Sequence, residues 1–248
     1  MATLDQVLQS LRIAKTHPEY SEFVGAEQVL AEEISNRMSK DTEFEAFLRT
    51  KEDEEYLLPC NSVDERQAMG CWVVKLSTAM NPKPRSISSP IMTLHAFCPE
   101  GDAEADYAFR SLIYEFLNAT THVHGNSKYP IWMLKQSHTD LRTTFYYIYT
   151  ELVQSGWPGT LFIFIHGMGP YHRKHQIESD FLLDLVSEIQ KKELSDEDDD
   201  LEREFCIKIL YTDSPQPSSG DSDNSKGKSK AQTLSSELEL SRQQSESE

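Results

Sequence analysis

Apolar residues recur at helical spacing along the first part of the chain. Residues 4–11 place leucine and valine on one helical face, and Thr3 with Gln6 forms a capping-box pattern in front of them. A second stripe covers residues 26–38. A third covers residues 42–48 and opens with a threonine followed three positions later by a glutamate. The pattern therefore predicts three amphipathic helices at the start of the chain.

The central part of the chain has a different pattern, in which short apolar runs alternate with helical stripes. The runs that predict buried strands are residues 70–76, 91–97, 160–165 and 205–211. The stripes that predict helices are residues 105–117, 140–153 and 177–189. Apolar strands alternating with helices are typical of a parallel sheet covered on both faces. We expect an α/β fold with a sheet of three to five parallel strands.

The acidity of the chain is concentrated in its flanks. The formal net charge is −17, and residues 1–65 hold 15 acidic against 6 basic side chains. Residues 66–190 hold 11 acidic against 10 basic side chains, so the part with the predicted strands is nearly neutral. Binding to nucleic acid needs a basic face, and an anionic membrane surface attracts the same residue types. We expect neither nucleic acid nor a membrane as a partner.

Composition divides the chain into three parts. Residues 1–65 form an acidic helical segment, residues 66–212 carry the strands, and residues 213–248 are rich in serine and hold no aromatic residue. A segment of the last kind buries too little surface to offset its chain entropy, which predicts a disordered tail. The longest apolar run, residues 161–165, is far shorter than a membrane span of about 20 residues. Four widely spaced cysteines favour reduced thiols, and we expect a cytoplasmic protein.

The stretch FIFIHGMG, Phe162–Gly169, carries the candidate chemistry. A strand that ends in His-Gly-x-Gly can supply the backbone donors of an oxyanion hole in an α/β-hydrolase, and His166, Gly167 and Gly169 fit that pattern. The sequence has no G-x-S-x-G nucleophile motif, and no histidine follows His175. The chain order of serine, acid and histidine that this fold uses cannot be completed.

An ordered series of landmarks gives the same stretch a second interpretation. The series consists of HAFC at 95–98, FRSLIYEFL at 109–117, FIFIHGMG at 162–169 and IKILYTDSP at 207–215. In order and spacing it resembles the NACHT-type signalling NTPases, P-loop proteins of the STAND class that are akin to the nephrocystin-type N-terminal domain. The resemblance covers about residues 68–215. It implies a three-layer, P-loop-NTPase-like sheet in which FIFI is the Walker B strand.

The positions that carry nucleotide chemistry depart from this family pattern. A P-loop is a glycine-rich loop followed by Lys and Ser/Thr; the matching segment keeps Lys75, Ser77 and Thr78 but lacks the loop glycines. A gene model that omits the P-loop would also explain that loss. The Walker B acid aligns with His166, a poor Mg²⁺ ligand because hard cations prefer oxygen. The family's last-strand arginine aligns with Asp213.

The resemblance and its departures together imply a signalling or scaffold module whose nucleotide chemistry is lost. Its partners would be proteins, intact NACHT-type proteins among them, and the family association is with self-recognition signalling in fungi. We expect no catalytic residue, no metal site and no bound cofactor. One alternative is a signalling NTPase that still binds ATP or GTP with Mg²⁺ through Lys75, Ser77 and Thr78, with His166 at the acid position. A second is a hydrolase-like protein that uses the His166 loop.

Overall fold

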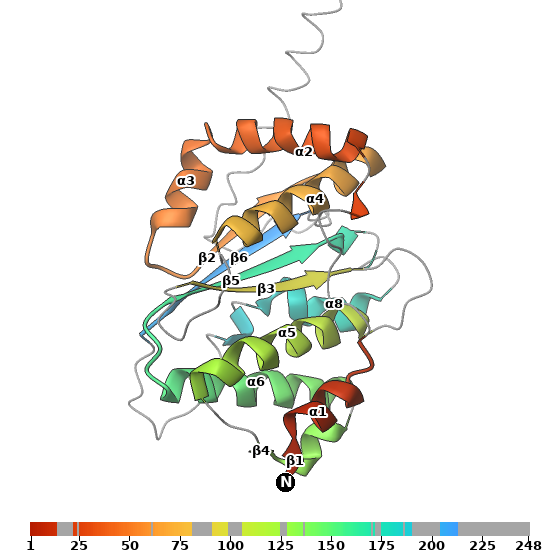
Figure 1. The fold of residues 1–248 in the computed structure, drawn as a ribbon, viewed down its shortest axis with the longest axis vertical. Coiled ribbons are helices and arrows are strands. Elements are labelled where there is room, and N and C mark those ends of the chain that lie inside the picture. The colour runs from red at the N-terminus through yellow and green to blue at the C-terminus, as the bar shows by residue number, and fades with distance from the viewer. Residues whose placement is uncertain are drawn as a thin grey trace, which may run out of the picture.

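The structure is a computed structural model. Helices lie on both faces of a parallel sheet (Figure 1). The structure describes residues 1–13, 22, 23, 25–60, 62–80, 91–98, 106–124, 128–135, 137–169, 171, 175–185, 187–189 and 204–212.

Four parallel strands form the central sheet. They are β2 (Glu54–Leu58), β3 (Ile91–Phe97), β5 (Thr160–His166) and β6 (Cys206–Thr212). The order across the sheet is β2-β6-β5-β3, so the chain starts at one edge, crosses to the other and returns through β5 to β6. His166 lies opposite both Phe97 and Thr212 in the register, which brings the carboxyl ends of the last three strands to one level.

Two helices, α3 (Thr42–Arg49) and α4 (Val63–Met80), cover one face of the sheet, and α2 (Gly25–Met38) packs on the outer side of α4 (Figure 1). Their contact with the sheet is largely aromatic. Phe47 of α3 is fully buried and meets Phe162 of β5 edge to face at a centroid distance of 6.4 Å. Phe44 packs on Trp72 of α4 at 5.7 Å. Such rings bury large apolar areas, so they account for much of the adhesion of this layer.

The opposite face is covered by α5 (Tyr107–His124), α6 (His138–Gln154) and α8 (Gln176–Leu183) (Figure 1). Its core also contains a cluster of aromatic rings. Phe109 of α5 lies 4.8 Å from Phe181 of α8, and Phe116 of α5 lies 5.5 Å from Phe145 of α6. The sheet is thus the middle of three layers, as the apolar strands predicted.

A small unit built from the N-terminal residues and from residues 128–134 packs beside this second helical layer. It consists of β1 (Ala2–Thr3), α1 (Leu4–Ser10), β4 (Lys128–Tyr129), which pairs with β1 antiparallel, and the 3-10 helix η2 (Ile131–Leu134). The capping box at α1 is confirmed: the Thr3 N–H donates to Gln6 Oε1 at 2.9 Å, and the Gln6 N–H donates to Thr3 Oγ1 at 3.3 Å.

Most predicted elements are confirmed. The runs at 91–97, 160–165 and 205–211 are β3, β5 and β6, and the three early helices are α1, α2 and α3. The predicted helices at 105–117, 140–153 and 177–189 correspond to α5, α6 and α8, although α8 ends at Leu183. The second capping box is wrong in detail. Asp41 caps α3 instead, accepting from the N–H groups of Glu43 and Phe44 at 2.9 and 3.0 Å.

Two predictions about the sheet are wrong. Residues 70–76 were expected as a strand and lie inside α4. This helix packs between α2 and the sheet, so residues 68–74 are all buried, and a helix that is apolar on all sides resembles a buried strand in sequence. Conversely, β2 lies within residues 1–65, where only helices were expected. It is a short edge strand of sequence EEYLL, with too few apolar residues for its period to stand out.

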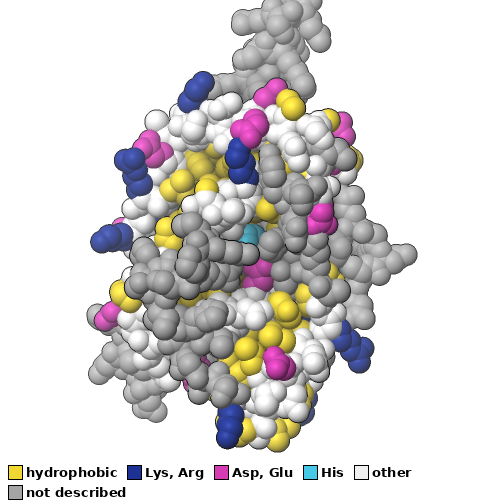
Figure 2. Space-filling view, in the orientation of Figure 1, with side chains coloured by type: hydrophobic (Ala, Val, Ile, Leu, Met, Phe, Trp, Pro, Cys, Tyr) yellow, Lys and Arg dark blue, Asp and Glu magenta, His cyan; other side chains and the backbone are white. Residues whose placement is uncertain are grey.

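Figure 2 shows charged side chains of both signs scattered over one face, with hydrophobic side chains between them. Among the described helices, none has the length and apolar character needed to cross a membrane. The predicted tail at 213–248 lies outside the described residues.

Candidate functional site at the carboxyl edge of the sheet

The topology marks one edge of the sheet as the place for a functional site. In open α/β sheets, ligands bind outside the carboxyl ends of the strands, at the point where the strand order reverses. The chain runs from β2 to β3 at the far edge and then returns through β5 to β6. The direction in which the chain crosses the sheet therefore reverses, and the neighbouring strands β2 and β6 mark the place. The site predicted by this rule lies at the ends of β2, β6 and β5.

His166, the last residue of β5, is enclosed at this edge. Its side chain faces the α4 layer, and its Nδ1 lies 2.5 Å from Thr212 Oγ1 at the end of β6. The residue is 8% exposed, and its ring lies 5.2 Å from that of Phe97. Burial, with a smaller contribution from the positive charge of Arg66, lowers the pKa of His166 from 6.5 to about 3. The imidazole is therefore neutral at physiological pH.

Two glycines allow this close packing. A methyl group on Gly70 of α4 would meet His166 Nε2 at 2.9 Å, so the helix backbone lies directly over the ring. Gly167 has a positive φ of 77°, a conformation that glycine adopts without strain. A methyl group there would lie 3.0 Å from the Cys98 carbonyl. Gly70 and Thr212 were missed in the sequence, because their proximity to His166 depends on the fold.

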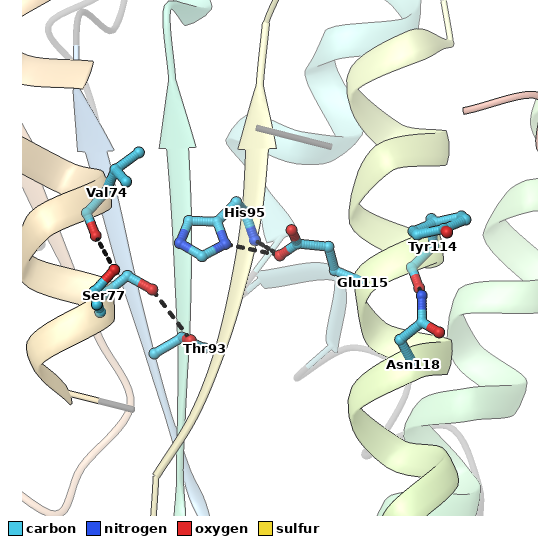
Figure 3. Close-up of polar contacts among 8 residues, drawn as sticks. Val74, Ser77, Thr93, His95, Tyr114, Glu115 and Asn118 are labelled. Carbon is cyan, nitrogen blue, oxygen red and sulfur yellow. Dashed lines mark hydrogen bonds and ion pairs between the residues drawn. The ribbon is translucent and has the colours of Figure 1, made fainter. Parts of the chain in front are cut away.

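The remaining candidate nucleotide ligands lie elsewhere, on the second half of α4. Lys75 pairs with Glu32 of α2, and both side chains are exposed. Ser77 donates to Thr93 Oγ1 of β3 at 3.2 Å inside the protein (Figure 3). Thr78 donates to the carbonyl of Val74 at 2.8 Å. These three side chains are bound to three different partners within the fold. Lys75 lies inside a helix and not in a loop between a strand and a helix, where a P-loop lysine lies.

The connection between β2 and α4 has its own electrostatic character. Residues 59–62 join the two elements, and Ser62 Oγ accepts from the Glu65 N–H at 3.1 Å. Asp64 and Glu65 occupy the first turn of α4. Acidic side chains at a helix N-terminus compensate the positive end of the helix dipole. This helix start therefore satisfies its charge from within the chain.

A second buried pair joins His95 of the edge strand β3 to Glu115 of α5. Glu115 Oε2 lies 2.8 Å from His95 Nδ1, and it accepts from the backbone N–H of the same histidine at 2.6 Å (Figure 3). The ring of His95 stacks on Phe164 of β5 at 5.5 Å. The carboxylate comes from α5 on the other face, so it reaches the histidine at the edge of the sheet.

The described residues contain no group of three or more His, Cys, Asp or Glu side chains arranged to hold a metal ion. Asp213 lies outside those residues. In comparisons with known proteins, no family model, no curated protein and no solved structure matches the chain.

Proposed function

We propose that the chain is a non-catalytic, NACHT-like signalling or scaffold module that acts through protein–protein contacts. The observation that carries the proposal is the connection from β2 to α4. A phosphate-binding loop joins a strand of the parallel sheet directly to the following helix. β2 and α4 are the first such pair in the sheet, and residues 59–62 between them read Pro-Cys-Asn-Ser. This stretch supplies neither the glycines nor the lysine that cradle a phosphate.

Electrostatics at the start of α4 support the same conclusion. A helix N-terminus attracts phosphate when its N–H groups and its positive dipole end are available. Ser62 already accepts from one of these N–H groups, and Asp64 and Glu65 place negative charge in the first turn. Both features oppose a bound triphosphate.

His166, at the end of β5, gives a separate argument that metal chemistry is lost. Mg²⁺ in NTPases is held by oxygen ligands, and the Walker B position supplies a carboxylate. The buried imidazole at the end of β5 contacts Thr212 and packs beneath Gly70. It packs between the sheet and the helix, at the position where the family pattern has an acid.

The alternatives receive less support. Residual binding by Lys75, Ser77 and Thr78 would require their side chains to converge, and each has its own partner on or beside α4. An oxyanion hole at the His166 loop would need the Gly167 N–H as a donor. That group donates to the Thr212 carbonyl at 3.1 Å.

Titration calorimetry with ATP and GTP, each with Mg²⁺, tests the proposal. We expect no binding at millimolar nucleotide. Micromolar binding that Lys75→Ala abolishes, while the exposed control Lys135→Ala leaves it intact, would overturn the non-catalytic assignment in favour of the residual NTPase.

The partner side of the proposal needs its own measurement. The purified chain is mixed with a purified intact NACHT domain, and the complex is followed by sedimentation. We expect a complex to form without nucleotide. A chain that sediments unchanged at every ratio of the two proteins contradicts this choice of partner.

A further inference from the structure

Exposed apolar side chains gather on the small unit that contains β1, α1, β4 and η2, at one end of the molecule (Figure 1). Five large hydrophobic side chains are exposed in the described part of the chain, and three of them belong to this unit: Met1 at 73%, Ile131 at 62% and Leu134 at 36%. Residues three apart in a 3-10 helix lie on one side, which aligns Ile131 with Leu134. Because β1 pairs with β4 antiparallel, Met1 comes next to Pro130, the residue before this helix. The three exposed side chains therefore belong to one surface.

The same unit is positively charged, although the chain as a whole has a formal net charge of −17. Residues 1–13 and 128–135 hold three basic side chains against one acidic side chain. Lys128 and Lys135 are exposed and lie on either side of η2 in the sequence. We refer to the following residues as the basic apolar patch: Met1, Lys128, Ile131, Leu134 and Lys135.

The other two exposed hydrophobic side chains have acidic surroundings. Val29 lies on α2, whose sequence holds three glutamates and one arginine. Val63 is the first residue of α4 and is followed by Asp64 and Glu65. An acidic, apolar ligand is therefore repelled at these two positions and attracted to the basic apolar patch.

One segment of this chain has the complementary composition. After Thr212 the sequence contains three residues of the aromatic and large aliphatic types, and all three are leucines within residues 234–240, LSSELEL. The same seven residues include Glu237 and Glu239. The segment thus offers three apolar and two negative side chains to a patch of three apolar and two positive ones.

The chain between β6 and this segment is long enough to reach the patch. The 21 residues 213–233 separate Thr212 from the segment. Fully extended, they span up to about 70 Å, whereas a domain of this size has a radius of gyration of about 17 Å. A tethered segment also acts at an effective concentration on the order of 1 mM, so even a weak contact is occupied.

We propose that residues 234–240 dock on the basic apolar patch of the same chain. The three leucines cover the apolar side chains of the patch, and Glu237 and Glu239 pair with its two lysines. The docked segment excludes other acidic, apolar ligands from this end of the molecule. This inference goes beyond the proposed signalling function and does not depend on it, because it uses neither the carboxyl edge of the sheet nor α4.

Carbodiimide cross-linking of the full chain tests the docking, because this reagent joins a lysine amine to a carboxylate that lies in contact with it. The amide bond forms between the two side chains, and the reagent leaves as a urea that carries the carboxylate oxygen. We expect mass spectrometry to find a lysine of the patch joined to Glu237 or Glu239. The exposed lysines Lys40 and Lys51 are the reference for random encounters, and their links to these glutamates should be at least tenfold rarer.

The variant Leu238→Ser with Leu240→Ser keeps every group that reacts. Its yield of links to the patch should fall at least tenfold, because the apolar contact is lost. Equal yields at the patch lysines and at Lys40 and Lys51 would overturn the proposal. A double variant that links as well as wild type would do the same.

Two further measurements distinguish the other occupants of the patch. In a mixture of ¹⁵N-labelled and unlabelled chains, links that combine the two isotopes would show that a second copy supplies the segment, and docking within one chain would be wrong. Phosphatidylserine vesicles test a membrane. Vesicle binding that Lys128→Glu with Lys135→Glu abolishes, in a chain that forms no link, would assign the patch to an anionic lipid surface instead.

Hydroxyl-radical footprinting gives a readout that needs no cross-link, since it measures the exposure of Ile131 and Leu134 directly. Reversing both patch lysines to glutamate should raise the oxidation rate of these side chains at least threefold. Adding Glu237→Lys and Glu239→Lys should restore the wild-type rate. The control, in which Lys40 and Lys51 are both replaced by glutamate, makes the same change in net charge and should leave the rate unaltered. A fourfold-substituted chain that stays as exposed as the lysine variant would contradict the charge pairing, and the proposal would fail.

Discussion

Gly70 of α4 lies against the ring of His166, at a distance that leaves no room for a side chain. A methyl group on Gly70 would meet Nε2 at 2.9 Å. The ring cannot move away freely, because its Nδ1 contacts Thr212 Oγ1 and the residue is 8% exposed. One glycine in a long buried helix therefore sets how closely α4 approaches the carboxyl edge of the sheet.

Gly70→Ala is expected to destabilise the protein although alanine is the better helix former. The gain in helix propensity is about 1 kcal/mol, and overpacking of a buried contact costs about 1–3 kcal/mol. We expect a net loss of up to about 2 kcal/mol in the free energy of unfolding, measured by urea denaturation. Gly25→Ala, where nothing lies within 4 Å of the added methyl, is the control and should not destabilise. A Gly70→Ala variant as stable as that control would contradict the close packing.

The buried imidazole of His166 makes stability depend on pH in the acid range. The folded protein holds the pKa of His166 at about 3, against 6.5 for the unfolded chain. Between these values the unfolded state binds the proton and the folded state does not. The stability associated with neutral His166 is therefore complete above pH 6.5 and falls as the pH drops toward 3, by a few kcal/mol in order of magnitude.

The comparison with His166→Asn isolates this contribution, since asparagine does not titrate. Urea denaturation at several pH values gives the free energy of unfolding of both proteins. We expect the wild-type curve to fall more steeply than that of the variant between pH 6.5 and 3. Parallel curves over that interval would show that His166 is not held neutral by the fold.

The sequence allowed the strands β3, β5 and β6 to be predicted, because each is a continuous apolar run bounded by polar or turn residues. It did not allow α4 to be recognised as a helix or β2 as a strand. The apolar run in α4 reflects contact with α2 on one side and the sheet on the other, a tertiary effect that removes the helical period. β2 is the reverse case, since an edge strand of five residues with two glutamates has little periodicity to detect.

The candidate site was predictable only in part. His166 was identified because it ends the strongest strand of the sequence. Its partners were not, because Gly70 and Thr212 approach it only after helix and sheet have packed. The mistaken strand at 70–76 also explains why Lys75, Ser77 and Thr78 were grouped as candidate ligands, since they lie inside a helix and have separate partners.

Lys208, a fully buried lysine of β6, forms an ion pair with Glu54 of the edge strand β2. Its Nζ lies 3.0 Å from Glu54 Oε2, donates to Thr50 Oγ1, and lies 5.3 Å from the ring centre of Phe47. Removing one partner of a buried pair costs about 3–5 kcal/mol. Because the Glu54 side chain is 41% exposed, we expect the smaller loss of about 1–3 kcal/mol for Glu54→Ala.

Lys208→Met should cost less than Glu54→Ala. Methionine has a similar length and leaves no buried charge, whereas Glu54→Ala leaves the ammonium group, among the described residues, with a hydroxyl and a ring as partners. Urea denaturation of both variants gives the comparison, with the exposed pair Glu45–Arg49 as reference through Glu45→Ala, which should be nearly neutral. The reverse order, with Lys208→Met the less stable protein, would mean that the ion pair itself stabilises the edge.

The four free thiols should differ sharply in reactivity. Cys71, Cys98 and Cys206 are buried, and Cys60 is partly exposed. Burial, together with the negative charge of Glu27, raises the pKa of Cys71 to about 11, so almost no thiolate forms there near neutral pH. We expect one fast thiol per folded chain in a disulfide-exchange assay at pH 8, and none in Cys60→Ser. Three slow thiols should become fast in denaturant in that variant. Fast labelling of Cys71 in the folded protein would show that α2 separates from α4, because the acidic side chains nearest this thiol, Glu27 and Glu32, belong to α2.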